Sequence, residues 1–446
     1  MTRPRRIRAL VLTAGIALGL LAGSAATHAG IPIGERPAGD VIWVDADGRA
    51  GPLRCNGGAS ALTTIQGGVD VARPGRTVRV CPGTYREQVV IRTDAITLEA
   101  DRPWTATIRP EAPPAGARIR PARMGAMVIV DAAAGVTVQG LRLSVGSGVL
   151  PGFCRYIVSG IVALEAPRVR ILSNRLIGGA TVDSTRCGLL NGIEVIGSDG
   201  ATVAWNLVRN FRLLGIGVDN GPLPVGAMDV RIFRNELYWQ HTGVECQEVG
   251  SDCFDPVDVP PTFLFSEGIS LGWVTAEVRR NTIVSDAPRS SLDGGIGAHS
   301  SAVTAVANIV RGADHGIFVD GSGGLVLRNR LMDGDTTGIL VEGDGCASGL
   351  RPGGCAASDA AAPAGCVAGA AGCPLATLVV RGNDVTGYAD YGIRTTRGGG
   401  TYIDNDARGN PGVDCADDSG RPVLNTWTGN LGYGARPRAI CGPRRG

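Results

Sequence analysis

The sequence predicts an all-β solenoid, in which one chain winds into the stacked coils of a parallel β-helix. Two columns of residues keep a common spacing, and the segments between them are too short for a helix. The first column is a glycine followed by isoleucine or valine, mostly 21 to 32 residues apart. The second is an asparagine that often follows the glycine by thirteen or fourteen residues. The glycines are Gly160, Gly192, Gly215, Gly243, Gly268, Gly295, Gly316, Gly338 and Gly392, and the asparagines are Asn174, Asn206, Asn281, Asn308, Asn329 and Asn405.

Each repeat contains two or three short strands separated by turns. Residues 316–320 form the first strand of one repeat, and residues 325–329 form the second. Because no helix fits between such strands, a βαβ crossover and the folds built from it are excluded. If each repeat stacks on the next, every strand pairs in parallel with its counterpart one coil away. Asparagine suits the turns, and glycine suits positions of close approach.

The composition agrees with this fold class. The 446 residues include 68 glycines and 4 % aromatic residues, and all 43 basic residues are arginines. Small and branched aliphatic side chains must therefore build the core, which favours strands. The same composition excludes a collagen, a coiled coil and a disordered polymer.

The first 29 residues have the features of a secretory signal peptide. Four arginines fall within the first eight residues, an apolar stretch spans residues 9–22, and small residues lead to Ala29. We therefore expect a secreted protein, extracellular or periplasmic. No later apolar run is long enough for a membrane span. Without the four arginines of that segment, 39 basic residues face 41 acidic ones, so we expect no nucleic-acid partner.

The twelve cysteines predict disulfides. An even number in an exported chain is most simply six disulfides, whereas a zinc site would need Cys-x-x-Cys clusters, which the sequence lacks. Chain order suggests the pairs Cys55–Cys81, Cys154–Cys187, Cys246–Cys253, Cys346–Cys355, Cys366–Cys373 and Cys415–Cys441.

Two consecutive segments carry a resemblance to a known family. Residues 64–75 (TIQGGVDVARPG) and 77–85 (TVRVCPGTY) resemble the N-terminal start of the right-handed parallel β-helix family, the pectate lyase-like superfamily of secreted carbohydrate-active proteins. The resemblance covers about residues 40 to 430. It implies a single-stranded right-handed parallel β-helix with a short N-terminal capping helix.

The expected domain organisation follows the chain. After the signal peptide, residues 30–76 form an N-terminal strand and the capping helix, and residues 77–409 form the coils. Loop insertions that carry disulfides interrupt the coils at about 246–266 and 345–374, where the period is broken. Residues 410–446 form a C-terminal cap, which protects the open end of the stack.

Acidic and histidine residues gather along the Gly-Ile strands. With the isoleucine inside, alternation predicts that the positions two before, two after and four after each glycine face outward. One outward column contains His241, Ser266, Asp293, Asp314 and Thr336, and another contains Asp219, Gln247, Gly272, His299, Asp320 and Glu342. Small residues at the strand centres would form a glycine floor between them, made of Gly215, Gly217, Gly243, Gly268, Ser270, Gly295 and Gly297. His315 is expected to point inward or into a turn.

Stacked acids leave three interpretations open. Asp293 over Asp314 predicts a Ca²⁺ site, a shared proton for acid–base catalysis, or two solvated surface carboxylates. The candidate catalytic residues are Asp293, His299, Asp314 and Asp320, and the candidate ligands of Ca²⁺ are Asp293 and Asp314. The candidate substrate-binding residues are Asp219, His241, Glu245 and Glu342.

These residues point to an extracellular polysaccharide as the partner. We expect a monomer that binds such a glycan along the Gly-Ile face, and whether it also cleaves the glycan, as a lyase or a glycoside hydrolase, stays open. The alternative is a non-catalytic structural or surface-exposed β-helix protein.

Overall fold

The structure, a computed structural model, describes most of the chain after residue 40. The expected signal peptide and eight of the twelve cysteines lie outside the described residues, as do both expected insertions apart from Ser266. The described ranges are 41–51, 54–55, 59–109, 117–118, 123–145, 157–178, 189–211, 213–220, 228–239, 266–286, 292–320, 323–342, 378–420 and 425–443.

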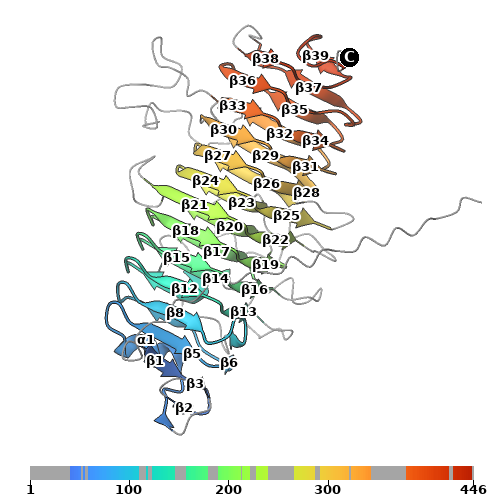
Figure 1. Cartoon of the computed structure of the whole chain (residues 1–446). Helices are drawn as coiled ribbons and strands as arrows, with labels where there is room; N and C mark the ends of the chain where they lie inside the picture. Colours follow the sequence, from blue (N-terminus) through green and yellow to red (C-terminus); the bar gives the residue numbers. More distant parts are fainter. Residues whose placement is uncertain are drawn as a thin grey trace, which may run out of the picture. The chain divides into compact units, whose positions relative to one another are not determined.

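Three long sheets run along the stack (Figure 1). The first, called sheet 1, begins with β1, the first strand of the described chain. All its neighbouring strands are parallel. In order it contains β1 (Val41–Val44), β5 (Thr77–Val80), β8 (Thr97–Ala100), β12 (Thr137–Gln139), β15 (Arg170–Leu172), β18 (Ala201–Ala204), β21 (Asp229–Phe233), β24 (Thr275–Arg279), β27 (Ala302–Val306), β30 (Gly324–Leu327), β33 (Leu378–Arg381), β36 (Gly400–Ile403) and β38 (Thr426–Thr428).

Sheet 2 contains the Gly-Ile strands. It is parallel except for its first strand, which pairs antiparallel with the second. In order it contains β10 (Ala117–Arg118), β11 (Arg123–Asp131), β14 (Ile157–Leu164), β17 (Asn191–Ile196), β20 (Leu214–Asp219), β23 (Glu267–Gly272), β26 (Leu292–His299), β29 (Ala313–Asp320), β32 (Thr337–Glu342), β35 (Tyr391–Thr395), β37 (Val413–Asp417) and β39 (Ala435–Arg436), and β7 (Val89–Ile91) also pairs with β11.

Sheet 3 completes each coil. It contains β6 (Gly83–Tyr85), β9 (Ala106–Ile108), β13 (Arg142–Ser144), β16 (Arg175–Ile177), β19 (Leu207–Arg209), β22 (Glu236–Trp239), β25 (Thr282–Ser285), β28 (Ile309–Arg311), β31 (Arg330–Met332) and β34 (Asp384–Thr386). A small antiparallel sheet near the N-terminal end is made of β2 (Arg49–Gly51), β3 (Arg54–Cys55) and β4 (Ala59–Ser60). The predicted all-β right-handed parallel β-helix is confirmed.

One helix is present among the described residues, α1 (Ile65–Val71), which packs on β1, β5 and β7. The Thr64 hydroxyl caps its start by accepting a hydrogen bond from the Gly67 amide at 3.1 Å. A Cβ at Gly68 would collide with Val44 and Val78, so glycine allows the helix to lie against the first strands. No helix in the described part of the chain is long and apolar enough to cross a membrane.

A continuous row of isoleucines forms the interior side of sheet 2. They pair from coil to coil in register, and each is fully buried. Stacking like residues on like residues buries the branched side chains without a thicker core. The row contains Ile161, Ile193, Ile216, Ile269, Ile296, Ile317, Ile339 and Ile393.

The glycine before each isoleucine also faces inward. A Cβ at any of them would lie under 3.0 Å from a carbonyl oxygen of the next coil, so close approach requires glycine here. In each of these strands of sheet 2, two consecutive residues, the glycine and the isoleucine, therefore face the interior. The regular alternation that the sequence predicts shifts by one residue at this step.

Buried asparagines form a ladder at the turn between sheets 1 and 3. The side-chain amide of each except the last donates a hydrogen bond to the next asparagine's Oδ1, at 2.8 to 3.1 Å. The ladder satisfies polar groups that would otherwise be buried without partners. Its members are Asn174, Asn206, Asn235, Asn281, Asn308, Asn329, Asn383, Asn405 and Asn430.

The unit expected at Gly243-Val244 lies outside the described residues. Strand β20 pairs directly with β23, and Asp219 lies opposite Gly272. Gln247 of the predicted outward column also lies outside the described residues, and the described register passes from Asp219 directly to Gly272.

Two disulfides join described residues, Cys55–Cys81 near the N-terminal end and Cys415–Cys441 near the C-terminal end. Each closes 26 residues of sequence.

Candidate functional site

The outer face of sheet 2 brings together several residues that the sequence predicts. The register places Asp219, Gly272, His299, Asp320 and Glu342 opposite one another on successive strands. Neighbouring strands of a sheet lie about 4.8 Å apart, so these residues form a row along the stack. His241 and Glu245 lie outside the described residues.

A buried glutamate that the sequence analysis missed lies beside His299. The Glu267 carboxylate oxygen Oε1 accepts a hydrogen bond from Nε2 of His299 at 2.9 Å, and Glu267 is only 4 % exposed. The two residues come from neighbouring strands, β23 and β26. A carboxylate bound in this way fixes the imidazole and stabilises its protonated form.

Glycines of the next coil leave the space for this carboxylate. A Cβ on Gly297 would overlap the Glu267 carboxylate, and a Cβ on Gly294 would lie 3.2 Å from its Oε1. A Cβ on Gly272 would likewise lie 3.0 Å from Oδ2 of Asp219. The expected glycine floor therefore exists in part, and it is covered by carboxylates of the preceding coil. Gly215, Gly268 and Gly295, which the sequence analysis also placed on it, face the interior.

His315 lies on the same outer face, so the inward alternative expected for it is wrong, while its contact with Thr336, in the turn before β32, agrees with the alternative of a turn. It pairs with Gly294 of β26, and its Nδ1 is 3.0 Å from Oγ1 of Thr336. Phe318 lies near both histidines, with its ring centroid 5.3 Å from His299 and 6.4 Å from His315. The inward glycine Gly316 explains this orientation, because the shift in alternation turns the preceding residue outward.

The two histidines have opposite shifts in pKa. Burial alone would lower the pKa of His299, but the charge and the hydrogen bond of Glu267 outweigh it and raise the pKa. At His315 burial dominates and lowers the pKa, although Asp293 and Glu267 oppose the effect. The environment therefore favours an imidazolium at His299 and a neutral imidazole at His315.

Asp293 and Asp314 are the second residues of β26 and β29, and both are half-buried. Oδ2 of Asp293 accepts hydrogen bonds from the Ser266 amide at 2.7 Å and from the Ser266 hydroxyl at 2.9 Å. The backbone oxygen of Asp314 accepts a hydrogen bond from Thr336. A Ca²⁺ ion between the two carboxylates stays a prediction.

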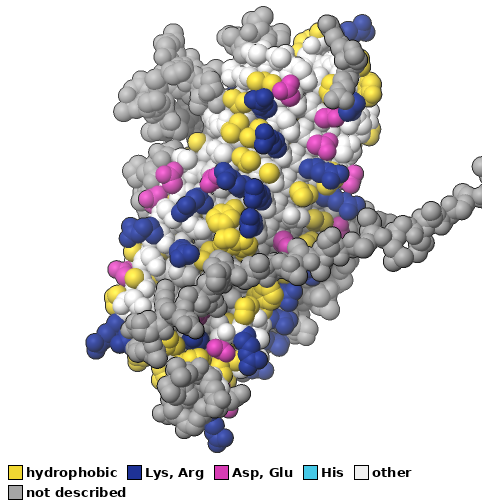
Figure 2. Space-filling view, in the orientation of Figure 1, with side chains coloured by type: hydrophobic (Ala, Val, Ile, Leu, Met, Phe, Trp, Pro, Cys, Tyr) yellow, Lys and Arg dark blue, Asp and Glu magenta, His cyan; other side chains and the backbone are white. Residues whose placement is uncertain are grey.

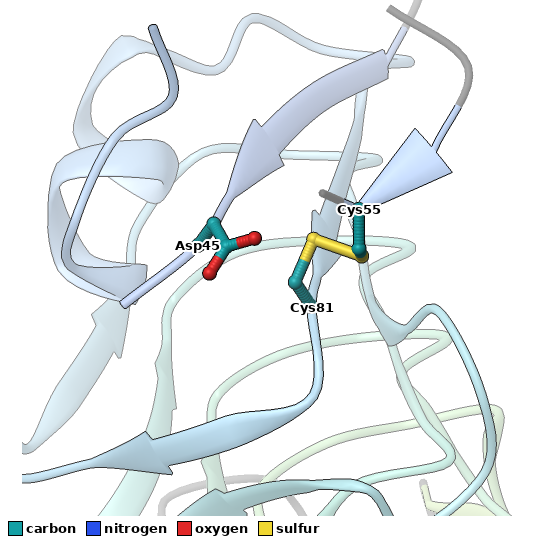
Figure 3. A group of neighbouring side chains, drawn as sticks. All are labelled: Asp45, Cys55 and Cys81. Carbon is teal, nitrogen blue, oxygen red and sulfur yellow. A yellow bond between two sulfur atoms is a disulfide. The ribbon is translucent and has the colours of Figure 1, made fainter. Parts of the chain in front are cut away.

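Within the described ranges, one group of three potential metal ligands lies close together, Asp45, Cys55 and Cys81 (Figure 3). The figure shows the two sulfur atoms joined in the disulfide beside the Asp45 carboxylate. A disulfide has no thiolate to offer, so this group does not fit a metal ion while it is oxidised.

A second buried glutamate, Glu194, lies on β17, on the outer face of the same sheet. Burial raises its pKa, and the hydrogen bonds from Ser159, at 2.6 Å, and from Asn191 partly offset this. Glu194 is 4 % exposed. The sequence analysis did not select it, because its role depends on neighbours that are 35 and three residues away in the chain.

Comparisons with known proteins show the fold. No protein-family model and no curated protein matches the sequence. The structure is similar to the catalytic unit of a thermostable GH87 α-1,3-glucanase from Streptomyces thermodiastaticus strain HF3-3, with a TM-score of 0.56 and 14 % identity over 90 % of this chain and 70 % of that one. Two further solved structures have lower TM-scores.

The first of these two is the A-module of mannuronan C-5 epimerase AlgE4 from Azotobacter vinelandii, at 0.43 and 14 % identity over 88 % of this chain and 98 % of that one. The second is an alginate lyase from Paenibacillus sp. str. FPU-7, at 0.45 and 13 % identity over 81 % and 98 %. The similarity to the glucanase unit and the three long parallel sheets agree on a right-handed parallel β-helix fold for this chain.

Proposed function

We propose that this protein binds an extracellular polysaccharide on the outer face of sheet 2 and cleaves it with His299 as the proton donor. The observation that carries the proposal is the hydrogen bond between the buried Glu267 carboxylate and His299. A buried carboxylate on the outside of a sheet contributes little to the core. Its cost in desolvation is offset when it holds an imidazole for proton transfer.

The two histidines supply an acid and a base. The raised pKa of His299 favours a proton on its ring near neutral pH, and the lowered pKa of His315 leaves that ring able to accept one. Cleavage of a glycosidic bond needs both roles, a donor to the leaving oxygen and an acceptor on the other side. Asp320 lies opposite His299 on the next strand and adds negative charge beside it.

Phe318 supplies a surface for a sugar ring. It is half-buried between the two histidines, and the apolar face of a pyranose packs well on an aromatic ring. The row of residues continues over several coils, which suits a linear polymer that runs along the stack.

Secretion is part of the same proposal. The signal-like first 29 residues and the two disulfides support an extracellular or periplasmic location. A polysaccharide outside the cell would be the partner available there.

Incubation with a panel of polysaccharides tests the function. We expect new reducing ends or unsaturated products that absorb in the near ultraviolet, and a loss of about 10²- to 10⁴-fold in rate for His299→Asn and Glu267→Gln. The control is Glu277→Gln, which removes a carboxylate from sheet 1. If correctly folded protein neither binds nor cleaves any glycan, the non-catalytic structural alternative replaces this proposal.

A further inference from the structure

Charge is distributed unequally among the three sheets of the central coils. In sheet 2 the six strands β17, β20, β23, β26, β29 and β32 contain seven carboxylates, two histidines and no arginine. The carboxylates belong to Glu194, Asp219, Glu267, Asp293, Asp314, Asp320 and Glu342.

The strands of the same six coils in sheets 1 and 3 carry more basic than acidic side chains. They contain six arginines and four acids. The arginines are Arg209, Arg231, Arg279, Arg311, Arg330 and Arg381. Figure 2 shows how widely arginine is spread over the face that it draws. Because acidic and basic residues nearly balance in the whole chain, the acidic face of sheet 2 reflects position and not composition.

The nearest arginine of sheet 2 on the C-terminal side is already paired. Arg394 lies on β35, two strands beyond the strand of His315, and its Nε donates a hydrogen bond to Asp418 at 3.0 Å. It is also stacked on Tyr391, with 4.8 Å between the guanidinium carbon and the ring centroid. The described strands around the histidines thus offer a sugar hydrogen-bond acceptors and imidazoles, while the His299 imidazolium is held by Glu267 and the Arg394 guanidinium by Asp418.

From this distribution we propose that the substrate is an uncharged polysaccharide and that its cleavage is hydrolytic. The inference rests on the proposed function. Carboxylates accept hydrogen bonds from sugar hydroxyls, whereas solvent-accessible ones such as the half-buried Asp320 and Glu342 repel the carboxylates of a polyuronate. A polymer with one negative charge per sugar would lie along a row of like charges.

The same charges oppose β-elimination. A lyase removes the proton next to the uronate carboxylate, and the dianion that develops needs a cation or several hydrogen-bond donors. Hydrolysis develops positive charge at the anomeric carbon, which nearby carboxylates stabilise. In that reaction the bond from the anomeric carbon to the leaving oxygen breaks, and the water oxygen bonds to that carbon. One proton goes to the leaving oxygen, and a base accepts the other from water.

Affinity electrophoresis of the full-length protein tests the substrate class. The probes are polygalacturonate, its fully methyl-esterified form, alginate, and uncharged glucans, mannans and xylans, at ionic strengths of about 0.01 M and about 0.15 M. We expect retention by at least one uncharged polymer at both ionic strengths, new reducing ends without near-ultraviolet absorbance, and no retention by a polyuronate. Retention by a polyuronate that His299→Asn abolishes, or an unsaturated product, would overturn the inference and leave the proposed function intact.

Failure of the proposed function would give different results in the same experiment. It would appear as no retention by any polymer, or as retention that His299→Asn and Glu267→Gln do not change. Both results also overturn the inference, because no glycan then binds at the histidines of the acidic face.

A charge variant tests the electrostatic cause. The double variant Asp320→Asn/Glu342→Gln keeps the shape of both side chains, and we expect it to strengthen binding of polygalacturonate at about 0.01 M salt by roughly tenfold relative to the wild-type protein. The matched control Asp229→Asn/Glu277→Gln removes two carboxylates from sheet 1, and we expect no gain. Equal gains in both variants would mean that net charge governs binding, against the inference.

Discussion

Nε2 of His299 donates a hydrogen bond to the Glu267 carboxylate across two neighbouring strands, at 2.9 Å. The carboxylate lies over Gly297, which has no side chain to displace it. The pair thus depends on three residues of two coils, and each can be changed separately.

Removal of the Glu267 charge should lower the pKa of His299. In Glu267→Gln the hydrogen bond to a charged partner is lost while burial remains, so the pKa falls below that of the wild-type protein. The pKa of His315 should fall as well, because Glu267 also raises it. Titration of the imidazole resonances by NMR measures both values. Glu277→Gln serves as the control, and an unchanged His299 in Glu267→Gln would contradict the assignment.

The two histidines should affect stability over opposite ranges of pH. The pKa of His299 is higher in the folded state than its ordinary 6.5, so its contribution is complete below pH 6.5 and is lost as pH rises through the raised value. The pKa of His315 is lower in the folded state, so stability is lost as pH falls from 6.5 through the lowered value.

Urea unfolding between pH 5 and pH 8, about the range in which histidine titrates, measures these dependences. His299→Asn should remove the loss on the alkaline side, and His315→Asn should remove the loss on the acidic side. The same pH profile of stability in both variants would show that neither histidine causes the pH dependence.

Gly297→Ala should break the pair without unfolding the protein. Its methyl group would displace the end of the Glu267 side chain, which can move at little cost. We expect a loss of less than about 1 kcal/mol in the free energy of unfolding, together with a lower His299 pKa and loss of activity. In contrast, Gly295→Ala faces the interior and the carbonyl oxygen of Gly316, and it should cost about 1–3 kcal/mol. Chemical denaturation distinguishes them, and equal losses would contradict the orientation of the two glycines.

Asn281→Ala should destabilise the stack at the centre of the ladder. The Asn281 amide donates to the carbonyl of Ile232 at 3.0 Å, and its Oδ1 accepts from both the backbone and the side chain of Asn235. Removal leaves these buried groups without partners, at a cost of about 2–3 kcal/mol. Thr275→Ala on exposed β24 should cost less than about 0.5 kcal/mol. Similar losses in both variants would show that the ladder is not a main source of stability.

The sequence was sufficient for the architecture because the fold repeats. Gly268, Gly295 and Gly316 each meet the same steric limit, so the same residue returns at each coil and the period is visible. The asparagine ladder is visible for the same reason.

The site was less predictable because it depends on contacts between coils. Glu267 contacts His299 and lies over Gly294 and Gly297, and the chain separates it from His299 by 32 residues. Its orientation follows from the inward glycine Gly268, which shifts the alternation by one residue. A strict alternation of inward and outward residues therefore gave His315 the wrong side and overlooked Glu267.

The glycine and isoleucine columns determine how the chain can diverge. Any side chain at those glycines meets the backbone of a neighbouring coil, so a substitution there requires the neighbouring strands to shift. The outward positions beside them have no such constraint. Evolution can therefore exchange the chemistry of this surface one coil at a time while the scaffold stays the same.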